Sequence, residues 1–172
     1  APLAHCALAL MGEGEVRDAR GDLVPAVEAL RAAGLEPVEL AAKEGLALIN
    51  GTDGMLGMLV LAIEDLRTLL ATADVTAAMS VEGLLGTDRV FAGDLQQLRP
   101  QHGQAVSARN IRALLDGSPI VASHRGPEDT RVQDAYSLRC WPAVGGAARD
   151  TVEHAAAVAS RELQAAIDNP VI

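Results

Sequence analysis

The chain has 172 residues, a formal net charge of −9 and an apolar fraction of 49%, with only one Phe, one Tyr and one Trp. This length suits one domain, and an interior of Ala, Leu, Val, Ile and Met suits closely packed helices. The negative charge, without any run of Lys or Arg, argues against a nucleic-acid partner, and every apolar stretch is too short for a membrane span.

The N-terminus and the cysteines indicate a cytoplasmic protein. The chain opens without Met and without the basic, apolar and cleavage-site order of a signal peptide, so we expect it to start inside a longer protein. Cys6 and Cys140 lie far apart without a Cys-x-x-Cys motif, which favours free, buried thiols in a reducing compartment.

The first forty residues predict two helices and a small hairpin. Pro2 suits the first turn of a helix, where its missing N–H costs nothing, and Gly12 suits the end of that helix. Gly34 suits the position after the second helix, because glycine readily adopts a positive φ. The predicted elements are a helix over 1–11, a hairpin over 14–22 with its tip at 18–21, a helix over 24–33 and a short extended piece over 35–40.

The strongest helical pattern begins at Asp53, which we predict to be an N-cap. Apolar residues recur at spacings of three and four through Leu70, and we expect helix to continue, with or without a kink, to Leu85. Nearly every face is apolar or small over 55–63. We therefore expect this helix to be buried in a bundle or between subunits.

The second half of the chain predicts further helices separated by loops. Glycines and Pro100 punctuate 86–103, and a proline at 170 forbids continuation of the last helix. The predicted elements are a helix over 104–115, an exposed loop over 116–130 with little to bury, and a helix over 144–168. The sequence therefore predicts a mainly α fold, organised as one unit over 1–172, with a small hairpin near the N-terminus.

The position of Asn50 makes it a candidate site residue. It lies between a short apolar helix and the long helix that starts at Asp53. Position alone leaves two interpretations open. Asn50 is a C-cap before Gly51, or it presents its amide to a cavity as both donor and acceptor.

Three polar residues at a spacing of three form the second candidate site. Gln133, Tyr136 and Arg139 would fall along one side of a helix that leads into the last long helix. A guanidinium can bind a carboxylate through two parallel hydrogen bonds, and a phenol can donate or accept a proton. The alternative is an ordinary, solvated first turn of helix with an Asp cap.

The four histidines do not indicate a metal site. His5 has no second ligand three or four residues away, so we expect a partly buried, hydrogen-bonded side chain. His102, His124 and His154 are scattered in polar surroundings. We predict no bound metal.

Four blocks of the sequence resemble the histidine ammonia-lyase family, in the family's order and at similar intervals. They are residues 1–5 (Ala-Pro-Leu-Ala-His), 43–52 (Lys-Glu-Gly-Leu-Ala-Leu-Ile-Asn-Gly-Thr), 132–140 (Val-Gln-Asp-Ala-Tyr-Ser-Leu-Arg-Cys) and 168–170 (Asp-Asn-Pro). The resemblance covers essentially the whole chain. It favours the functional interpretation of both candidate sites.

The resemblance implies the long-helix bundle of the ammonia-lyase and fumarase-like superfamily, in a homotetramer whose active sites are shared between subunits. It implies non-oxidative deamination of L-histidine to trans-urocanate and ammonia. The electrophile would be 4-methylideneimidazol-5-one (MIO), formed autocatalytically from an internal Ala-Ser-Gly. Asn50 would hydrogen-bond the region of the electrophile and substrate, and Arg139 would bind the substrate carboxylate. Tyr136 and Gln133 would line the site and position the ring or the prosthetic group.

The sequence departs from the family in two places. The family's Ala-Ser-Gly stands a few residues before the first block, and these 172 residues contain none, so we expect the segment alone to be inactive. The family usually has Pro-Gln after the Arg-Cys pair, whereas Pro142 is followed here by Ala143 and preceded by Trp141. These changes bear on the local geometry of the site.

Two other functions stay open beside the histidine ammonia-lyase. One is a phenylalanine or tyrosine ammonia-lyase, or an aminomutase, on the same scaffold. The other is a non-catalytic helical oligomerisation module, supported by Ala143 and the missing tripeptide. The Ser-Leu-Arg-Cys motif that contains Arg139 resembles the histidine branch more than the phenylalanine and tyrosine branches.

Overall fold

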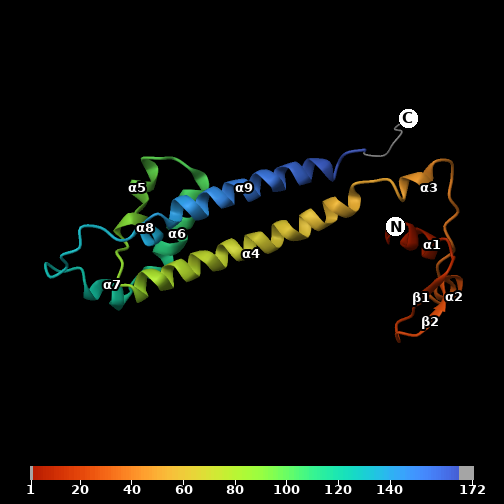
Figure 1. The fold of residues 1–172 in the computed structure, drawn as a ribbon, viewed down its shortest axis with the longest axis horizontal. Coiled ribbons are helices and arrows are strands. Elements are labelled where there is room, and N and C mark those ends of the chain that lie inside the picture. The colour runs from red at the N-terminus through yellow and green to blue at the C-terminus, as the bar shows by residue number, and fades with distance from the viewer. Residues whose placement is uncertain (1, 167–172) are drawn as a thin grey trace. The chain divides into compact units, whose positions relative to one another are not determined.

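The computed structural model describes residues 2–166, most of which are helical (Figure 1). The elements in chain order are α1 (Pro2–Leu10), β1 (Glu15–Arg17), β2 (Leu23–Pro25), α2 (Ala26–Ala32), α3 (Glu44–Ala47), α4 (Asp53–Gly83), the 3-10 helix η1 (Arg89–Phe91), α5 (Gly93–Gln97), α6 (His102–Leu115), α7 (Pro119–Ser123), α8 (Tyr136–Arg139) and α9 (Trp141–Glu162). This arrangement confirms the predicted mainly α fold with a small hairpin.

The described residues group into two compact units. The first contains residues 2–58 and 164–166, and the second is Leu59–Leu163. The prediction that residues 1–172 are a single, incomplete central segment of a longer lyase chain stays a prediction.

The hairpin of the first unit closes at the predicted tip. Its strands β1 and β2 pair antiparallel. Between them, the Asp18 carboxylate accepts hydrogen bonds from the backbone N–H groups of Arg20 and Asp22. Gly21 has a φ of +88°, a conformation that glycine adopts without strain. The local turn chemistry therefore explains why this part could be predicted.

The second helix starts later than we predicted. Val24 and Pro25 pair with residues of β1, so they belong to β2, and α2 begins only at Ala26. Pairing with a neighbouring strand overrides the local helical pattern at these two positions. The predicted end is confirmed, because Gly34 follows α2 with a φ of +71°.

The predicted extended piece over 35–40 forms no strand in the described part of the chain. Its contact is a backbone hydrogen bond of 2.9 Å from the Val38 N–H to the carbonyl of Leu10, at the end of α1. This stretch is therefore irregular chain attached to the first helix.

α4 is a single helix of 31 residues that continues well past Leu70. Asp53 is its first residue rather than its N-cap, and the carbonyl of Thr52 accepts the first hydrogen bond, from Leu56 N–H at 2.9 Å. An acidic side chain in the first turn still interacts favourably with the helix dipole. Within residues 2–166, no helix combines the length and the apolarity needed to cross a membrane.

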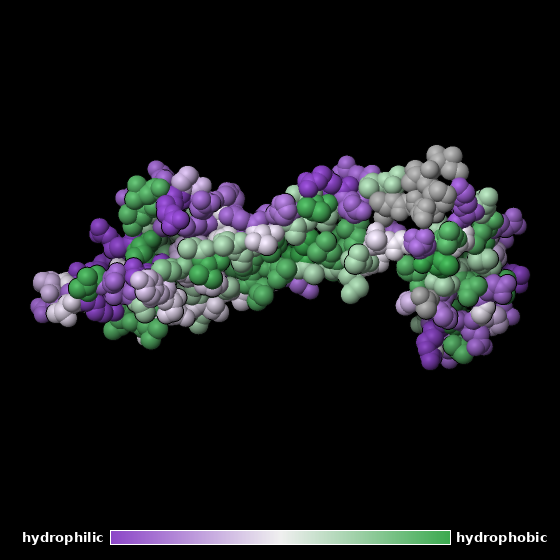
Figure 2. Space-filling view, turned by 45° about the horizontal axis from the view of Figure 1, so that its top comes forward, coloured by the Kyte–Doolittle hydropathy of each residue, from purple (hydrophilic) through white to green (hydrophobic). Residues whose placement is uncertain are grey.

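One side of α4 is buried in this chain, and the opposite side carries exposed large apolar residues among polar ones. Ile63 and Val81 are buried. Leu61, Leu69 and Met79 lie on the other side of the helix and are 70%, 60% and 65% exposed, and apolar atoms gather along this helix in Figure 2. The predicted burial holds for one side of α4 within the single chain, whose described segments leave the other side exposed. Burial between subunits stays a prediction.

The core of the second unit lies where α4, η1, α6 and α7 meet. Val81, Phe91, Ile111 and Val121 are fully buried there. α6 also packs along α9, and the two helices lie side by side in Figure 1. This packing fixes the start of α9, which follows directly on the candidate site.

The predicted exposed loop over 116–130 contains the short helix α7. The hydroxyl oxygen of Ser118 accepts a hydrogen bond of 3.1 Å from Val121 N–H and caps the helix, and Pro119 occupies its first turn. Val121 is part of the core, so the prediction that this stretch has little to bury is wrong at that position. Residues 125–130 are exposed, as predicted.

The last long helix begins and ends earlier than we predicted. α9 runs over Trp141–Glu162 with Pro142 in its first turn, where a backbone N–H is not needed. Residues 163–166 are turn and irregular chain. The predicted stop at 168–170 lies outside the described residues.

Candidate active site

Arg139 and Tyr136 come together on the single turn of α8. The Cζ atom of Arg139 lies 4.3 Å from the centroid of the Tyr136 ring, so the guanidinium stacks on the phenol. Tyr136 is 73% exposed. The Nε atom of Arg139 is buried and has no hydrogen-bond partner among the described residues. A buried donor without a partner costs about 1–3 kcal/mol, so this guanidinium is suited to an acceptor brought by a ligand.

Gln133 does not share this helix. It is exposed and lies in a bend before α8, so the predicted single helical face is wrong for this residue. The helix starts only at Tyr136 because the carboxylate of Asp134 bonds to Thr87 instead of capping a helical turn. α8 also ends at Cys140 rather than continuing smoothly into α9.

Asn50 lies in a bend between α3 and α4, in the first unit. The C-cap of α3 is Leu48, so the interpretation of Asn50 as a helix C-cap is wrong. Its side chain is exposed and makes no hydrogen bond to the described residues. The described residues of this unit therefore leave both the donor and the acceptor of the amide unpaired.

A buried carboxylate on α4 is held next to the start of α9. Asp74 is 1% exposed. Its Oδ1 accepts from the indole N–H of Trp141 at 3.0 Å, and its Oδ2 accepts from Asn110 Nδ2 at 2.8 Å and Arg149 Nη2 at 2.5 Å. These bonds offset the cost of burying the charge. Residue spacing did not single out Asp74, although a carboxylate in an Ala-rich part of a helix, without a basic residue three or four positions away, is a usable signal.

A second buried carboxylate stands beside Gln133. The side chain of Asp134 is 6% exposed, and its Oδ2 accepts the Thr87 N–H at 2.6 Å. Its Oδ1 lies 3.9 Å from Arg131 Nη1. Asp134 therefore joins the candidate-site segment to the chain that follows α4, a role that residue spacing did not reveal.

Two exposed ion pairs of the second unit lower the pKa of a carboxylate. The hydrogen bond of 2.9 Å from Arg131 Nε to Asp129 Oδ1 holds the pKa of Asp129 below its usual value. Arg67 Nη2 lies 2.9 Å from Glu153 Oε2, which joins α4 to α9, and the side-chain hydrogen bonds between them lower the pKa of Glu153. Both carboxylates are therefore ionised at neutral pH.

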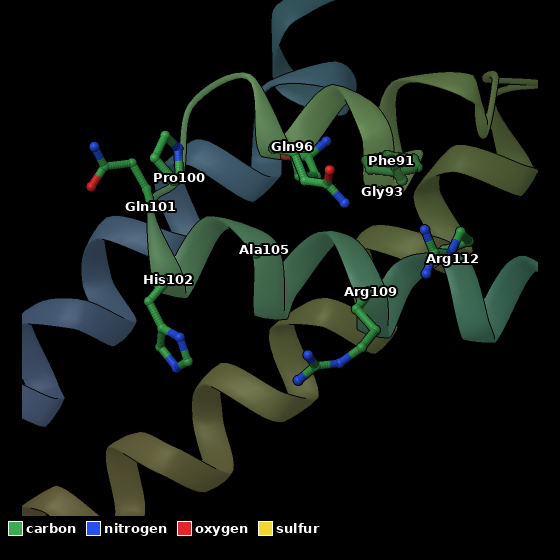
Figure 3. A pocket seen from close by; sticks show the side chains of 10 residues that line it. Phe91, Gly93, Gln96, Pro100, Gln101, His102, Ala105, Arg109 and Arg112 are labelled. Carbon is green, nitrogen blue, oxygen red and sulfur yellow. The ribbon is translucent and has the colours of Figure 1, made fainter.

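A cavity of about 410 Å³ lies between α5 and α6 (Figure 3). Phe91 and Gln96 line one side, and His102, Arg109 and Arg112 come from α6. The cavity contains none of the residues predicted from the sequence, so it does not define the candidate site.

The histidines and cysteines form no metal centre in the described part of the chain. No group of three or more His, Cys, Asp or Glu side chains in residues 2–166 is arranged to hold an ion. His124 Nε2 lies 2.9 Å from the carbonyl of Gly86. Cys6 and Cys140 are free thiols, as predicted, but the prediction that they are buried is wrong for Cys6, which is exposed.

Comparison with known proteins identifies similar chains. The model of the aromatic amino acid lyase family matches residues 1–172. The chain is 59% identical over 172 residues to the histidine ammonia-lyase of Streptomyces coelicolor, covering 100% of this chain and 33% of that protein. It therefore spans about a third of the length of the curated relatives that it matches.

Solved structures agree with this match. The tyrosine aminomutase from Streptomyces globisporus is 38% identical with a TM-score of 0.86, covering 100% of this chain and 36% of the other. The histidine ammonia-lyase from Trypanosoma cruzi is 38% identical with a TM-score of 0.80, covering 99% and 31%. A family match over the full length, on a helical fold shared with these structures, shows that this chain belongs to the aromatic amino acid lyase family.

Proposed function

We propose that the complete protein is a histidine ammonia-lyase, which removes ammonia from L-histidine to give trans-urocanate. The observation that carries this proposal is the partly buried Arg139, stacked on Tyr136 with an Nε donor that the described residues leave unpaired. The identity of 59% to a histidine ammonia-lyase supports the choice of substrate.

Arg139 suits the carboxylate of an amino acid. A guanidinium offers parallel N–H groups that match two carboxylate oxygens, and it stays charged at any physiological pH. Stacking on Tyr136 limits the freedom of the guanidinium plane, so less ordering is needed when substrate binds. Arg139 therefore acts as the substrate-binding residue in this proposal.

Tyr136 and Gln133 complete the part of the site carried by the second unit. Both side chains are exposed, so they are free to face substrate in the complete protein. The phenol of Tyr136 can hold or pass on a proton at its oxygen, and the amide of Gln133 can donate and accept at once. These residues orient the amino acid while Arg139 fixes its carboxylate.

Asn50 fits the prosthetic group that the family match implies. Its unused amide offers an N–H donor to a carbonyl oxygen and an oxygen to a donor, which suits the imidazolone of MIO. When present, MIO would supply an electrophile that makes the amino group of the substrate a better leaving group. The 172 residues contain no Ala-Ser-Gly, so the proposal concerns the complete protein.

Exposed apolar side chains on the outer side of α4 support an assembly of subunits, which we propose to be a homotetramer with shared active sites. Leu61, Leu69 and Met79 are exposed in the single chain, and large apolar side chains of this kind are stabilised by burial against another subunit. The two free thiols support a cytoplasmic location, where cysteines stay reduced.

The test of the substrate-binding residue is Arg139→Met in the complete protein. Loss of charge-assisted hydrogen bonds worth about 1.5–3 kcal/mol should raise the KM for L-histidine by roughly 10- to 150-fold. Arg139→Lys should give an intermediate KM, because an ammonium keeps the charge without the planar fork. Arg161→Met, an exposed arginine near the end of α9, is the matched control. An unchanged KM in Arg139→Met would remove this residue from the site.

The substrate is tested by offering L-histidine, L-phenylalanine and L-tyrosine to the complete protein. Turnover of L-histidine to urocanate, followed by its ultraviolet absorbance, is the expected result. Preference for an aromatic amino acid would identify a lyase or aminomutase of the aromatic branches instead. No turnover of any of them would favour a non-catalytic helical module.

A further inference from the structure

The segment that carries three proposed site residues has little to hold it in place by itself. Gln133 and Tyr136 are exposed. α8 is a single turn of four residues, and an isolated turn of this length is not stable in water. Contacts outside the segment must therefore fix its position.

The upstream end is held by Asp134. Its Oδ2 accepts the backbone N–H of Thr87 at 2.6 Å, and Thr87 follows closely on the end of α4. The chain at Gly86 packs closely against this carboxylate, since a Cβ added to Gly86 would lie 3.2 Å from Asp134 Oδ2. The carboxylate is almost completely buried, so this contact is shielded from competition by water.

The downstream end is held by Trp141, two residues after Arg139. Its indole N–H donates to Asp74 Oδ1 at 3.0 Å, and its ring packs against the core together with Leu138. Asp74 is itself fixed by Asn110 and Arg149. The anchor is therefore a rigid, hydrogen-bonded carboxylate rather than a mobile surface group.

Both anchors lead to the same helix, because Asp74 lies within α4 and Thr87 lies just beyond its end. We propose that Asp134 and Trp141 are positioning residues, which hold the 133–141 segment at its two ends so that Arg139 and Tyr136 are correctly placed before substrate binds. The inference rests on the proposed function. Its physical basis is that small displacements of a binding group lose much of its effect on the reaction.

The experiment compares Trp141→Phe with Asn110→Ala in the complete protein. Each variant removes one uncharged donor to Asp74, but only Trp141 belongs to the segment. Both should lower the thermal midpoint by similar amounts. Trp141→Phe should raise the KM for L-histidine by about tenfold, with a much smaller change in kcat, and Asn110→Ala should raise it less, because Arg149 still fixes Asp74. A KM in Trp141→Phe no higher than that of the wild type would mean that Trp141 is merely structural.

A second pair of variants tests the upstream anchor. Asp134→Ala should raise KM, whereas Asp134→Asn should recover most of the wild-type value, because an amide oxygen can still accept the Thr87 N–H. Equal effects of Ala and Asn, or no effect of either, would overturn the role of Asp134. This pair also decides the proposal if Trp141→Phe does not fold.

Failure of this inference differs from failure of the proposed function. If Arg139→Met leaves KM unchanged, the carboxylate site itself is wrong. If Arg139→Met raises KM but Trp141→Phe and Asp134→Ala do not, only the positioning role is wrong. Binding of L-histidine to a complete protein whose Ala-Ser-Gly serine is replaced by Ala gives the same comparison without turnover.

Discussion

At the scale of single residues, two glycines set how closely α6 and α9 approach. A Cβ added to Gly103 would lie 2.2 Å from the carbonyl oxygen of Gly146, and one added to Gly146 would lie 2.2 Å from Gln104 N. Backbone cannot yield as a flexible side chain can. Any larger residue at either position must therefore push the two helices apart.

We predict that Gly146→Ala destabilises the protein by about 1–3 kcal/mol, because an overpacked helix contact forces backbone shifts. Gly83→Ala is the matched control, since a Cβ there meets nothing within 4 Å. That control should be neutral or slightly stabilising, because alanine favours helix over glycine. Thermal unfolding of the complete proteins measures both effects, and equal midpoints would contradict the close approach of the two backbones.

At the scale of elements, α7 depends on one capping residue. Ser118 accepts from Val121 N–H at the start of the helix, and its own hydroxyl donates to the Glu82 carboxylate near the end of α4. The Ser118 side chain thus caps α7 and links it to α4.

We predict that Ser118→Ala costs about 1 kcal/mol of stability, the usual contribution of an N-cap. Amide hydrogen exchange over Pro119–Ser123 should become faster, because the first turn loses its partner. Ser123→Ala is the control, since that hydroxyl only donates to the carbonyl of Ile120 at an exposed position. Exchange that accelerates equally in both variants would argue against capping by Ser118.

At the scale of the whole molecule, charge joins α4 to α9 through Arg67 and Glu153. The pKa of Glu153 is lower in the folded protein than the ordinary value of 4.5. The ion pair therefore stabilises the folded protein fully at pH values above 4.5, the ordinary pKa of Glu. This stabilisation is lost as the pH falls through the lowered pKa of Glu153.

We predict that Glu153→Gln lowers the thermal midpoint slightly at neutral pH, and that the difference from the wild type disappears under acid conditions. Thermal unfolding from about pH 7 to about pH 3 measures this difference. Glu162→Gln, at the end of α9, provides a carboxylate without an ion pair to the described residues. A difference that persists unchanged at low pH would show that the effect of Glu153 is not electrostatic.

The proposed assembly is also tested at this scale, on the side of α4 that carries the exposed Leu61, Leu69 and Met79. We predict that Leu69→Lys dissociates the oligomer of the complete protein, because a charge would be buried in an apolar interface. Leu114→Lys, at a comparably exposed position on α6, should leave the oligomer intact. Sedimentation of both variants measures the assembly, and an intact Leu69→Lys oligomer would remove this face from the interface.

Much of the secondary structure of this protein follows from the local sequence. The turn at Asp18, the stop at Gly34 and the length of α4 follow from capping, glycine conformation and apolar spacing, and the structure contains each of them. Asn50, Gln133, Tyr136 and Arg139 were selected by resemblance to a family, because position alone left a structural role open for each. Whether they act together stays a prediction.

Only the tertiary structure decided the features that depend on partners distant in the chain. Val24 and Pro25 join a strand because β1 offers hydrogen bonds, and Asp134 binds Thr87 rather than capping α8. Asp74 meets Trp141, 67 positions away, and spacing within a helix cannot reveal such a contact. Local preferences differ by about 1 kcal/mol or less per residue, so a buried charge or strand partner readily overrides them. The candidate residues could therefore be named from the sequence, whereas the long-range contacts of the 133–141 segment could not.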